Sequence, residues 1–375
     1  MSIPISYLRS SSIGNWGFCE HQFFLTYTLG LEYKVNHKAE LGSVTHGVLE
    51  ILAQIKKHFQ TSSDSYYLNN KDMDLDYIVN LEDFIKEYKL SPLEVDKINS
   101  TRINKDVYKW NCFIEYDHVR HGVDLVEYLC VKLTDYYKKH SPNNWVPIDY
   151  KHVNNFTWLC LDFSNNTFDP RRRDIVDIET HFDITLPFDW AKYEYFIGDE
   201  HLTGQLSLKG TMDLTTKISD DTYEIIDWKT GQKLDWAKNK PKTYESLHDD
   251  HQLLLYYYVA KQLYPDKHIL MSIFFIRDGG PYTLCFDDSK LEQGLKLFKD
   301  TYESIKNTKI PRLLDNRQKD FRCNRICDYY KQKVGKSNIC QFIHKDIKTN
   351  GIDETIKNYT KEGHKISHYS APGDV

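Results

Sequence analysis

Two short segments of the sequence carry acidic and basic residues with the spacing of a metal site. The segment 224–231 reads EIIDWKTG, so Asp227 and Lys229 stand two residues apart and share one face of a strand. Asp213 lies fourteen residues before Asp227, and the turn signal SDDT at 219–222 would fold the two stretches into a hairpin that brings the carboxylates together. Because buried charges need compensation, this group is either an ion pair at a sheet edge or a metal site.

The metal-site interpretation implies a specific chemistry. Two carboxylates and a backbone carbonyl form the hard oxygen cage that suits Mg²⁺ or Mn²⁺. Such an ion activates water and polarises a phosphoryl oxygen, and Lys229 would stabilise the charge that develops in the transition state. This is the chemistry of metal-assisted phosphodiester hydrolysis.

Cysteine residues form a second candidate group. Cys19 lies near the N-terminus, and Cys323, Cys327 and Cys340 cluster in the stretch CNRICDYYKQKVGKSNIC. Spaced Cys residues in an intracellular protein favour metal ligation or catalysis over disulfides. The remaining four are scattered and are predicted to be core thiols: Cys112, Cys130, Cys160 and Cys285.

The elements that must position these residues follow from the hydrophobic pattern. Helical spacing predicts a helix over 40–59, with His46 and Glu50 on the face opposite its apolar stripe, where a solvated i,i+4 pair would suffice. Alternation predicts a strand from about 174 to Pro187, a strand–turn–strand over 201–218 and a returning strand over 223–231, which together make a three-stranded meander. A helix ending at Pro265, a hairpin over 268–288 and a helix over 289–307 follow. The predicted fold is α/β, a mixed central sheet flanked by helices.

This pattern divides the chain into five parts. Residues 1–59 and 166–320 would form one core, 60–165 a mainly helical insertion, 321–345 the cysteine segment and 346–375 a tail with one short helix. Loop signals stand at 141–145 and 163–170.

Bulk composition restricts the function classes. The net charge of −5 does not by itself indicate nucleic-acid binding, although the basic residues of 171–173 and Lys233, Lys238, Lys240 and Lys242 are either local nucleic-acid contacts or solvated surface. No apolar run reaches the roughly 20 residues of a membrane helix, and no signal peptide is visible, so we expect a cytoplasmic protein without membrane contact. High Lys, Asn, Ile, Tyr and Asp with little Ala suggests an AT-rich genome, as in a phage or a low-GC bacterium.

The combination GTMDLTT…EIIDWKTG resembles the G-x-x-D…D-x-K-T-G core of the PD-(D/E)XK nuclease superfamily, in its RecB-like branch. THGVLE is similar to that branch's helix with a metal-binding His, and QLLLYYY is similar to its Gln-x-x-x-Tyr motif. The N-terminal SYLRSSSIGNWGFCEHQFFLTYTLGL resembles its Ser-rich, Cys-bearing helix. The motifs span roughly 1–55 and 174–345, and the resemblance implies a restriction-endonuclease-like core.

The resemblance implies a role for each matching residue. Asp213, Asp227 and His46 would bind Mg²⁺ or Mn²⁺, together with the carbonyl of Trp228, and Lys229 would be the catalytic lysine. The motif pair Gln252 and Tyr256 would orient the lysine or contact the DNA backbone. Around this set, Glu179 is either a carboxylate near the metal or an exposed strand residue, and Glu50 is expected to be structural.

The same resemblance extends to the cysteines. Cys19, Cys323, Cys327 and Cys340 resemble the four-Cys iron–sulfur staple of AddB-like and CRISPR-adaptation nucleases, although the spacings of three and then twelve residues depart from the usual pattern. Soft thiolates suit a [4Fe–4S] cluster or Zn²⁺, and thiols without metal remain the third alternative. In either metal case the group would be structural and would tie the chain ends together.

Several functions share these motifs. The first is an Mg²⁺- or Mn²⁺-dependent DNA exonuclease of recombination, replication or end processing, acting on single strands or on DNA ends. The alternatives are a structure-specific endonuclease and a non-catalytic DNA-binding scaffold of a nuclease–helicase complex. The sequence contains no G-x-x-x-x-G-K-[ST] motif, so a helicase or recombination partner would be a separate chain.

Overall fold

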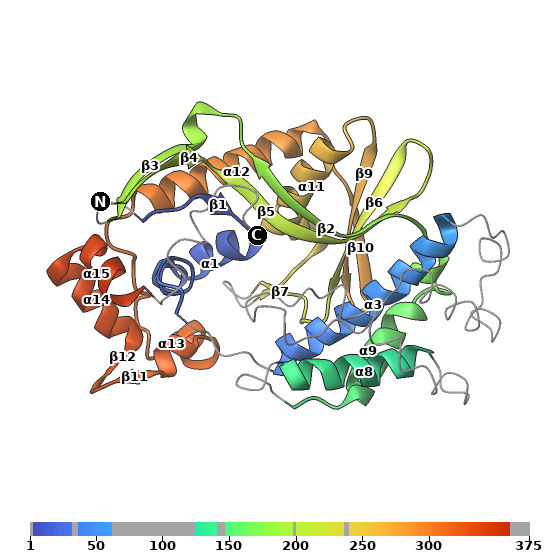
Figure 1. Ribbon diagram of the computed structural model, residues 1–375, viewed down its shortest axis with the longest axis horizontal. Coiled ribbons are helices and arrows are strands. Elements are labelled where there is room, and N and C mark those ends of the chain that lie inside the picture. Colours follow the sequence, from blue (N-terminus) through green and yellow to red (C-terminus); the bar gives the residue numbers. More distant parts are fainter. Residues whose placement is uncertain are drawn as a thin grey trace.

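A mixed six-stranded sheet lies at the centre of the structure (Figure 1). The computed structural model describes residues 3–31, 37–61, 125–140, 147–197, 200–235 and 240–360. The strand order is β1-β5-β6-β9-β10, and β2 pairs with the other edge of β5. The strands are β1 (Tyr7–Leu8), β2 (Asp174–Thr185), β5 (Ser207–Lys217), β6 (Thr222–Lys229), β9 (His268–Phe275) and β10 (Gly280–Cys285). The predicted fold class, a mixed sheet flanked by helices, is confirmed.

Helices cover both faces of this sheet, and each face has its own hydrophobic cluster (Figure 1). On one side lie α11 (His251–Leu263) and α12 (Asp288–Asn307), and on the other lie α3 (His37–Thr61), α8 (Leu125–His140) and α9 (Tyr150–Leu161). Ile225 belongs to the first cluster and Ile226 to the second, because neighbouring strand residues point to opposite faces. The middle of β6 is therefore buried on both faces, and the charged residues that it carries there, Glu224 and Asp227, need polar partners.

The predicted meander is present as β2, β5 and β6, which pair antiparallel in that order. The predicted turn within 201–218 is wrong. β4 (Glu200–Gln205) instead pairs with β3 (Lys192–Ile197), and this hairpin is inserted between β2 and β5. Gly210 of β5 stands opposite Phe182 in the ladder, where a Cβ would approach the ring Cζ to 2.6 Å. The lack of a side chain at Gly210 therefore leaves room for the Phe182 ring.

The described part of the insertion is helical, as expected, and belongs to the layer formed by α3. Leu129 and Leu133 of α8 and Val153 of α9 are fully buried in the cluster of α3. The 163–170 loop is confirmed by left-handed backbone at Ser164 and Asn165 and at the next residue. Residues 62–124, the loop signal at 141–145, Cys112, Lys238 and the side chains of Ile55 and Phe59 lie outside the described residues.

Helices from the two ends of the chain pack together at one end of the molecule (Figure 1). The N-terminal part contains α1 (Ser10–Phe18), α2 (Glu20–Phe23) and η1 (Phe24–Thr28), and the C-terminal part contains α14 (Ile339–Asn350) and α15 (Ile352–Tyr359). The expected tail from 346 with one short helix corresponds, over 346–360, to the end of α14 and the short helix α15, both of which have buried residues. Buried isoleucines hold the helix pair in place: Ile343, Ile347, Ile352 and Ile356.

Short elements complete the description. They are η3 (Pro170–Arg172), η4 (Asp189–Ala191), β7 (Leu234–Asp235), β8 (Lys240–Pro241), α10 (Tyr244–Leu247), η5 (Arg322–Ile326), α13 (Asp328–Lys331), β11 (Lys333–Val334) and β12 (Ser337–Asn338). No helix within the described ranges has the length and apolarity needed to cross a bilayer.

A buried polar network fixes the register of the central strands. Arg173, at the start of β2, forms an ion pair with Glu224 of β6 and donates to Thr216 Oγ1 of β5 at 3.1 Å. Ser272 of β9 donates to the other oxygen of Glu224. Because Glu224 is only 4 % exposed, its charge requires these partners.

We expect Arg173→Ala to lower the free energy of unfolding by about 3–5 kcal/mol, because it leaves the buried Glu224 carboxylate without its cation. Urea denaturation measures the effect. The exposed neighbour Arg172 provides the control, since Arg172→Ala should change stability by less than about 0.5 kcal/mol. Equal effects of the two substitutions would contradict the role of the network.

Candidate active site

Strands β5 and β6 separate where the two predicted carboxylates lie. They pair from Lys217↔Tyr223 to Leu214↔Ile226, and continuation of this register would place Asp213 opposite Asp227. At that point Trp228 N donates to the side chain of Asp213, with 2.8 Å between N and Oδ2. The Asp213 carboxylate thus takes the place of the next backbone hydrogen bond between the two strands. We call this point, where β5 and β6 separate, the fork, and both aspartates lie at it.

The partner strand β2 changes its orientation at the same position. Ile178 packs in the cluster of α3, whereas Phe182 packs in the cluster of α11, although residues four apart share a face in a regular strand. Glu179, which lies between them, has φ 47°, and this left-handed backbone costs a non-glycine residue roughly 1–2 kcal/mol. The register places Glu179 beside Asp213, so the strained residue lies at the fork.

Asp227 is a buried carboxylate with a polar partner on each oxygen. It is 1 % exposed, and its Oδ1 accepts a hydrogen bond from Gln252 Nε2 at 2.9 Å. Lys229 Nζ lies 2.5 Å from Oδ2, so this ammonium is the charged partner of the second oxygen. Burial raises the pKa of Asp227 to about 6, and the opposing effect of Lys229 is smaller.

The charge of Lys229 is maintained by the two carboxylates. Burial alone would lower the pKa of Lys229, but Asp227 and Asp213 raise it further than burial lowers it, so the pKa lies above its ordinary value. The group is therefore an ammonium at neutral pH. It can stabilise negative charge and cannot act there as a base.

The motif pair on α11 reaches Asp227 from the other side. The N-cap Asp250 accepts from the backbone N of Gln252 and starts the helix at this point. Gln252 Nε2 donates to both Asp227 Oδ1 and Tyr256 OH, the latter at 3.0 Å. Burial and the charge of Asp227 raise the pKa of Tyr256 well above its ordinary value, so the phenol stays protonated. The pair positions Asp227.

His46 approaches the fork from α3. Its Nδ1 lies 3.5 Å from Asp213 Oδ2, and its ring packs edge-on against Trp228 with centroids 6.1 Å apart. Burial, aided by the Lys229 charge, lowers the pKa of His46 to about 4, while a hydrogen bond with the Trp228 backbone acts in the opposite direction. The imidazole is therefore neutral at pH 7, the form that can bind a metal.

A cleft of about 740 Å³, partly open to solvent, lies between α3 and the fork. His46, Glu50, Glu179 and Asp213 are among the residues that line it. The expectation of a solvated His46–Glu50 pair is wrong, since Glu50 is only 2 % exposed. Sequence analysis placed Glu50 on the face of α3 opposite its apolar stripe and so treated it as exposed. In the structure, β2 and β5 also contact α3 and cover part of that face.

Close packing controls the width of this cleft. A Cβ on Gly42 of α3 would come within 2.7 Å of Thr230 Oγ1, in the Thr-Gly that follows β6. Gly42 therefore lets α3 approach the end of β6. Sequence analysis did not identify Gly42 or Thr230. The one local signal was the Thr230-Gly231 pair, which marks the end of the strand.

The donor set at the fork fits a hard divalent cation. Asp213, Asp227, neutral His46 and the Trp228 backbone lie there, and Lys229 is the cation against Asp227 in this structure. In the part of the chain that the structure describes, no group of three or more Cys, His, Asp or Glu side chains is arranged so that it could hold a metal ion. The chemistry of the donors, two carboxylates and an imidazole, supports Mg²⁺ or Mn²⁺.

The four predicted cysteines converge elsewhere. Cys19, Cys323, Cys327 and Cys340 line one pocket between the N-terminal helices and the C-terminal segment, and Arg322 lies beside them. A hydrogen bond with the Cys340 thiol lowers the pKa of Cys327 to about 7, whereas burial raises that of Cys323 to about 12. Of the scattered thiols, Cys130 and Cys160 are buried as predicted, but Cys285 is exposed.

Two histidines that sequence analysis missed lie next to this pocket. His21 is fully buried, and its ring packs edge-on against His344, with centroids 5.3 Å apart. Burial lowers the pKa of His21 to about 3, so it is neutral. His21 follows Cys19 by two residues, but an isolated His in a sequence does not indicate that its side chain will be buried beside a cysteine pocket.

Comparison with known families gives one match. The family described as the PD-(D/E)XK nuclease superfamily matches residues 123–332. That range contains Asp213, Asp227, Lys229, Gln252 and Tyr256, whereas His46, Cys19 and Cys340 lie outside it. It also begins within the expected insertion and so includes α8 and α9. No curated protein matches the chain.

We expect Mn²⁺ or Mg²⁺ to stabilise the folded chain through the fork. At a concentration 100 times the dissociation constant, a bound ion adds about 2.7 kcal/mol to the free energy of unfolding. Asp213→Asn should abolish this increase, because it removes one charge of the site and keeps an acceptor for Trp228 N. Thermal unfolding with and without metal measures it.

The matched control is Glu354→Gln on α15, where the side chain is 49 % exposed. This variant should keep the full metal-dependent increase. If Asp213→Asn responded to metal as the wild type does, the ion would bind elsewhere.

Proposed function

The chain belongs to the PD-(D/E)XK nuclease superfamily, and from this premise we propose that it is an Mg²⁺- or Mn²⁺-dependent DNA exonuclease of the RecB-like type. Nucleases of this superfamily generally use these ions. The observation that carries the proposal is the buried Asp227, which lies against Lys229 and in register with Asp213 at the fork of β5 and β6. A scaffold that had lost activity would have no need to keep these charges buried together.

The proposal assigns each residue of the fork a task. Asp213, Asp227, His46 and the Trp228 carbonyl would hold the divalent ion. When bound, the ion supplies Lewis-acid polarisation of the phosphoryl oxygen and lowers the pKa of bound water. Lys229 provides a positive charge for the oxygens of the scissile phosphate.

Other residues position this set. Gln252 holds Asp227 in orientation through its amide and is itself fixed by Tyr256. Glu179 and Glu50 add negative charge to the wall of the cleft, which strengthens its preference for a cation. In this proposal, 1–59 and 166–320 form the nuclease core, and the described helices α8 and α9 support α3 from behind.

We further propose that the cysteine pocket holds a structural metal group, a [4Fe–4S] cluster or Zn²⁺. The support is that Cys19 lines one pocket with three thiols that follow it by more than 300 residues of chain, Cys323, Cys327 and Cys340. A group bound there would join α2 to the C-terminal helices. It is chemically distinct from the oxygen-rich fork, so two different metals are expected.

The first test is DNA cleavage with Mg²⁺ or Mn²⁺ on linear and covalently closed circular substrates. We expect degradation of linear DNA only. Lys229→Ala should lower kcat by at least about 100-fold, because it removes a charge that stabilises the transition state.

Lys217→Ala is the matched control, since Lys217 lies at the far end of β5 in an exposed pair with Asp220. Cleavage of circles would support an endonuclease instead. Absence of metal-dependent cleavage on every substrate would contradict the nuclease proposal and support a DNA-binding scaffold that works with a separate helicase or recombination protein.

The second test is the metal content of protein purified without oxygen. We expect iron with acid-labile sulfide, or zinc, and Cys327→Ser should remove it and lower the thermal unfolding temperature. The exposed Cys285 supplies the control, because Cys285→Ser should leave metal content unchanged. Wild-type protein without bound metal would show that the four thiols are only packed together.

A further inference from the structure

A line of polar side chains runs along the exposed face of β2 and β5, away from the fork. Lys209 and Thr211 of β5 stand opposite Asp183 and His181 of β2, in the same ladder that brings Glu179 beside Asp213. Thr211 Oγ1 lies 2.8 Å from His181 Nδ1, and Lys209 Nζ lies 2.8 Å from Asp183 Oδ2. We call these residues, together with Tyr7 and Arg9, the polar strip.

The face change at Glu179 is the reason that this strip is continuous with the site. Beyond the fork, Phe182 and Met212 point into the core with α11, so their sequence neighbours point outward. With about 3.3 Å per residue, Lys209 lies roughly 13 Å from Asp213 along the strand. The strip therefore leads directly from the candidate metal ligands to a basic end.

That basic end is formed around one phenol ring. Tyr7 of β1 pairs with Ser207, next to Lys209. The Arg9 guanidinium lies 5.1 Å and the Lys209 ammonium 5.2 Å from the centroid of the Tyr7 ring. Burial, partly offset by Arg9, raises the pKa of Tyr7 to about 12, so the phenol remains protonated. Two positive charges, those of Arg9 and Lys209, therefore lie at this ring. Among the described residues, Asp183 forms an ion pair with one of them, Lys209.

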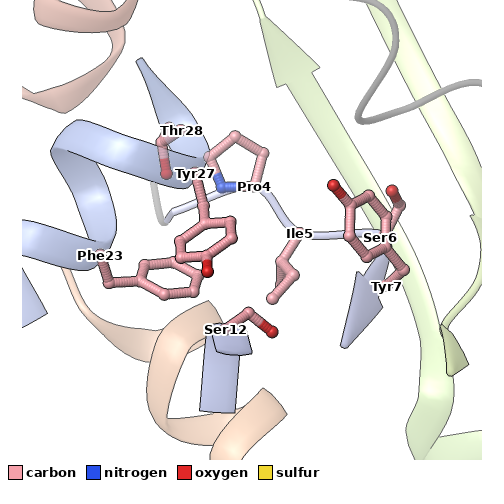
Figure 2. Close-up of a pocket in the computed structure, with 8 residues that line it drawn as sticks. All are labelled: Pro4, Ile5, Ser6, Tyr7, Ser12, Phe23, Tyr27 and Thr28. Atoms are coloured by element: carbon pink, nitrogen blue, oxygen red, sulfur yellow. The ribbon is translucent and has the colours of Figure 1, made fainter. Parts of the chain in front are cut away.

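Residues of the N-terminal segment pack next to Tyr7 (Figure 2). In Figure 2 the rings of Phe23 and Tyr27 lie on one side of Ile5, and Tyr7 lies on the other. All of these residues line a small hollow between β1 and the N-terminal helices. The hollow contains no carboxylate, so it is a packing feature that supports β1 and not a second reaction site.

We propose that the polar strip binds the DNA strand that extends from the scissile phosphate, and that Arg9 and Lys209 together bind one of its phosphates. This inference rests on the proposed nuclease function. A surplus cation beside a protonated phenol fits a phosphate diester, which carries one negative charge and accepts hydrogen bonds. At the 3.4 Å axial rise of a stacked strand, the distance corresponds to at most about four nucleotides from the cleavage site, and to fewer in an extended single strand.

The test is the binding of fluorescent single-stranded DNA in the absence of divalent ions, where no cleavage interferes. For oligonucleotides of about 15 nucleotides, the double variant Arg9→Gln with Lys209→Gln should bind about tenfold more weakly. The slope of log K against log salt should fall in magnitude by about 0.7, since the two cations bind one phosphate and each phosphate contact on a single strand contributes about 0.7.

Two further variants make the test specific. Asp183→Asn should strengthen binding of the oligonucleotide of about 15 nucleotides about two- to threefold, because it removes the carboxylate that competes with the phosphate for Lys209. Lys299→Gln, on α12 beyond the opposite side of the sheet, removes one exposed charge as a control and should leave both affinity and slope unchanged.

Each result has one meaning. Weaker binding and a smaller salt slope in the double variant, with tighter binding by Asp183→Asn, support the strip. An affinity and a slope of the double variant equal to those of Lys299→Gln overturn it, while wild-type cleavage of DNA would still support the nuclease. Wild-type protein that neither binds nor cleaves DNA would remove the proposed function and the strip with it.

Discussion

Two aspartates buried side by side are the constraint from which the rest of the structure follows. Asp213 is 8 % exposed and Asp227 is 1 % exposed. Two neighbouring negative charges repel each other strongly where little water is present. The fold offsets this cost with the Lys229 ammonium, the Trp228 N–H and the Gln252 amide. A divalent cation would offset it more completely, which connects the strain of the fold to the chemistry that we propose.

The surrounding elements can be understood as supports for that pair. The fork of β5 and β6 frees the Trp228 backbone to face Asp213 and His46. Helix α11 begins at Asp250 so that Gln252 reaches Asp227, and α3 approaches the fork because Gly42 has no side chain. The left-handed Glu179 turns β2 at the same position, so the strand leaves the site with its polar side outward. Backbone strain at Glu179 therefore lies where the proposed reaction occurs.

Sequence reasoning found the parts that depend on local pattern. The mixed sheet, the helices and the positions of Asp213, Asp227 and Lys229 follow from periodicity, turn signals and a short motif. It failed where distant packing decides. Glu50 looked exposed because the helix pattern does not show a second covering layer. The turn expected within 201–218 is absent because β4 pairs with β3, a contact that the alternation of apolar residues does not encode. The face change at Glu179 has no local signal at all, since glycine or asparagine would be the usual residue there.

Anomalous X-ray scattering from crystals grown with Mn²⁺ would test the central claim most directly. Our account predicts one strong peak at the fork, about 2.1 Å from carboxylate oxygens of both Asp213 and Asp227 and within bonding distance of His46. Peaks confined to other parts of the surface, with Lys229 still in contact with Asp227, would show that the two carboxylates form a structural ion pair and not a catalytic metal site.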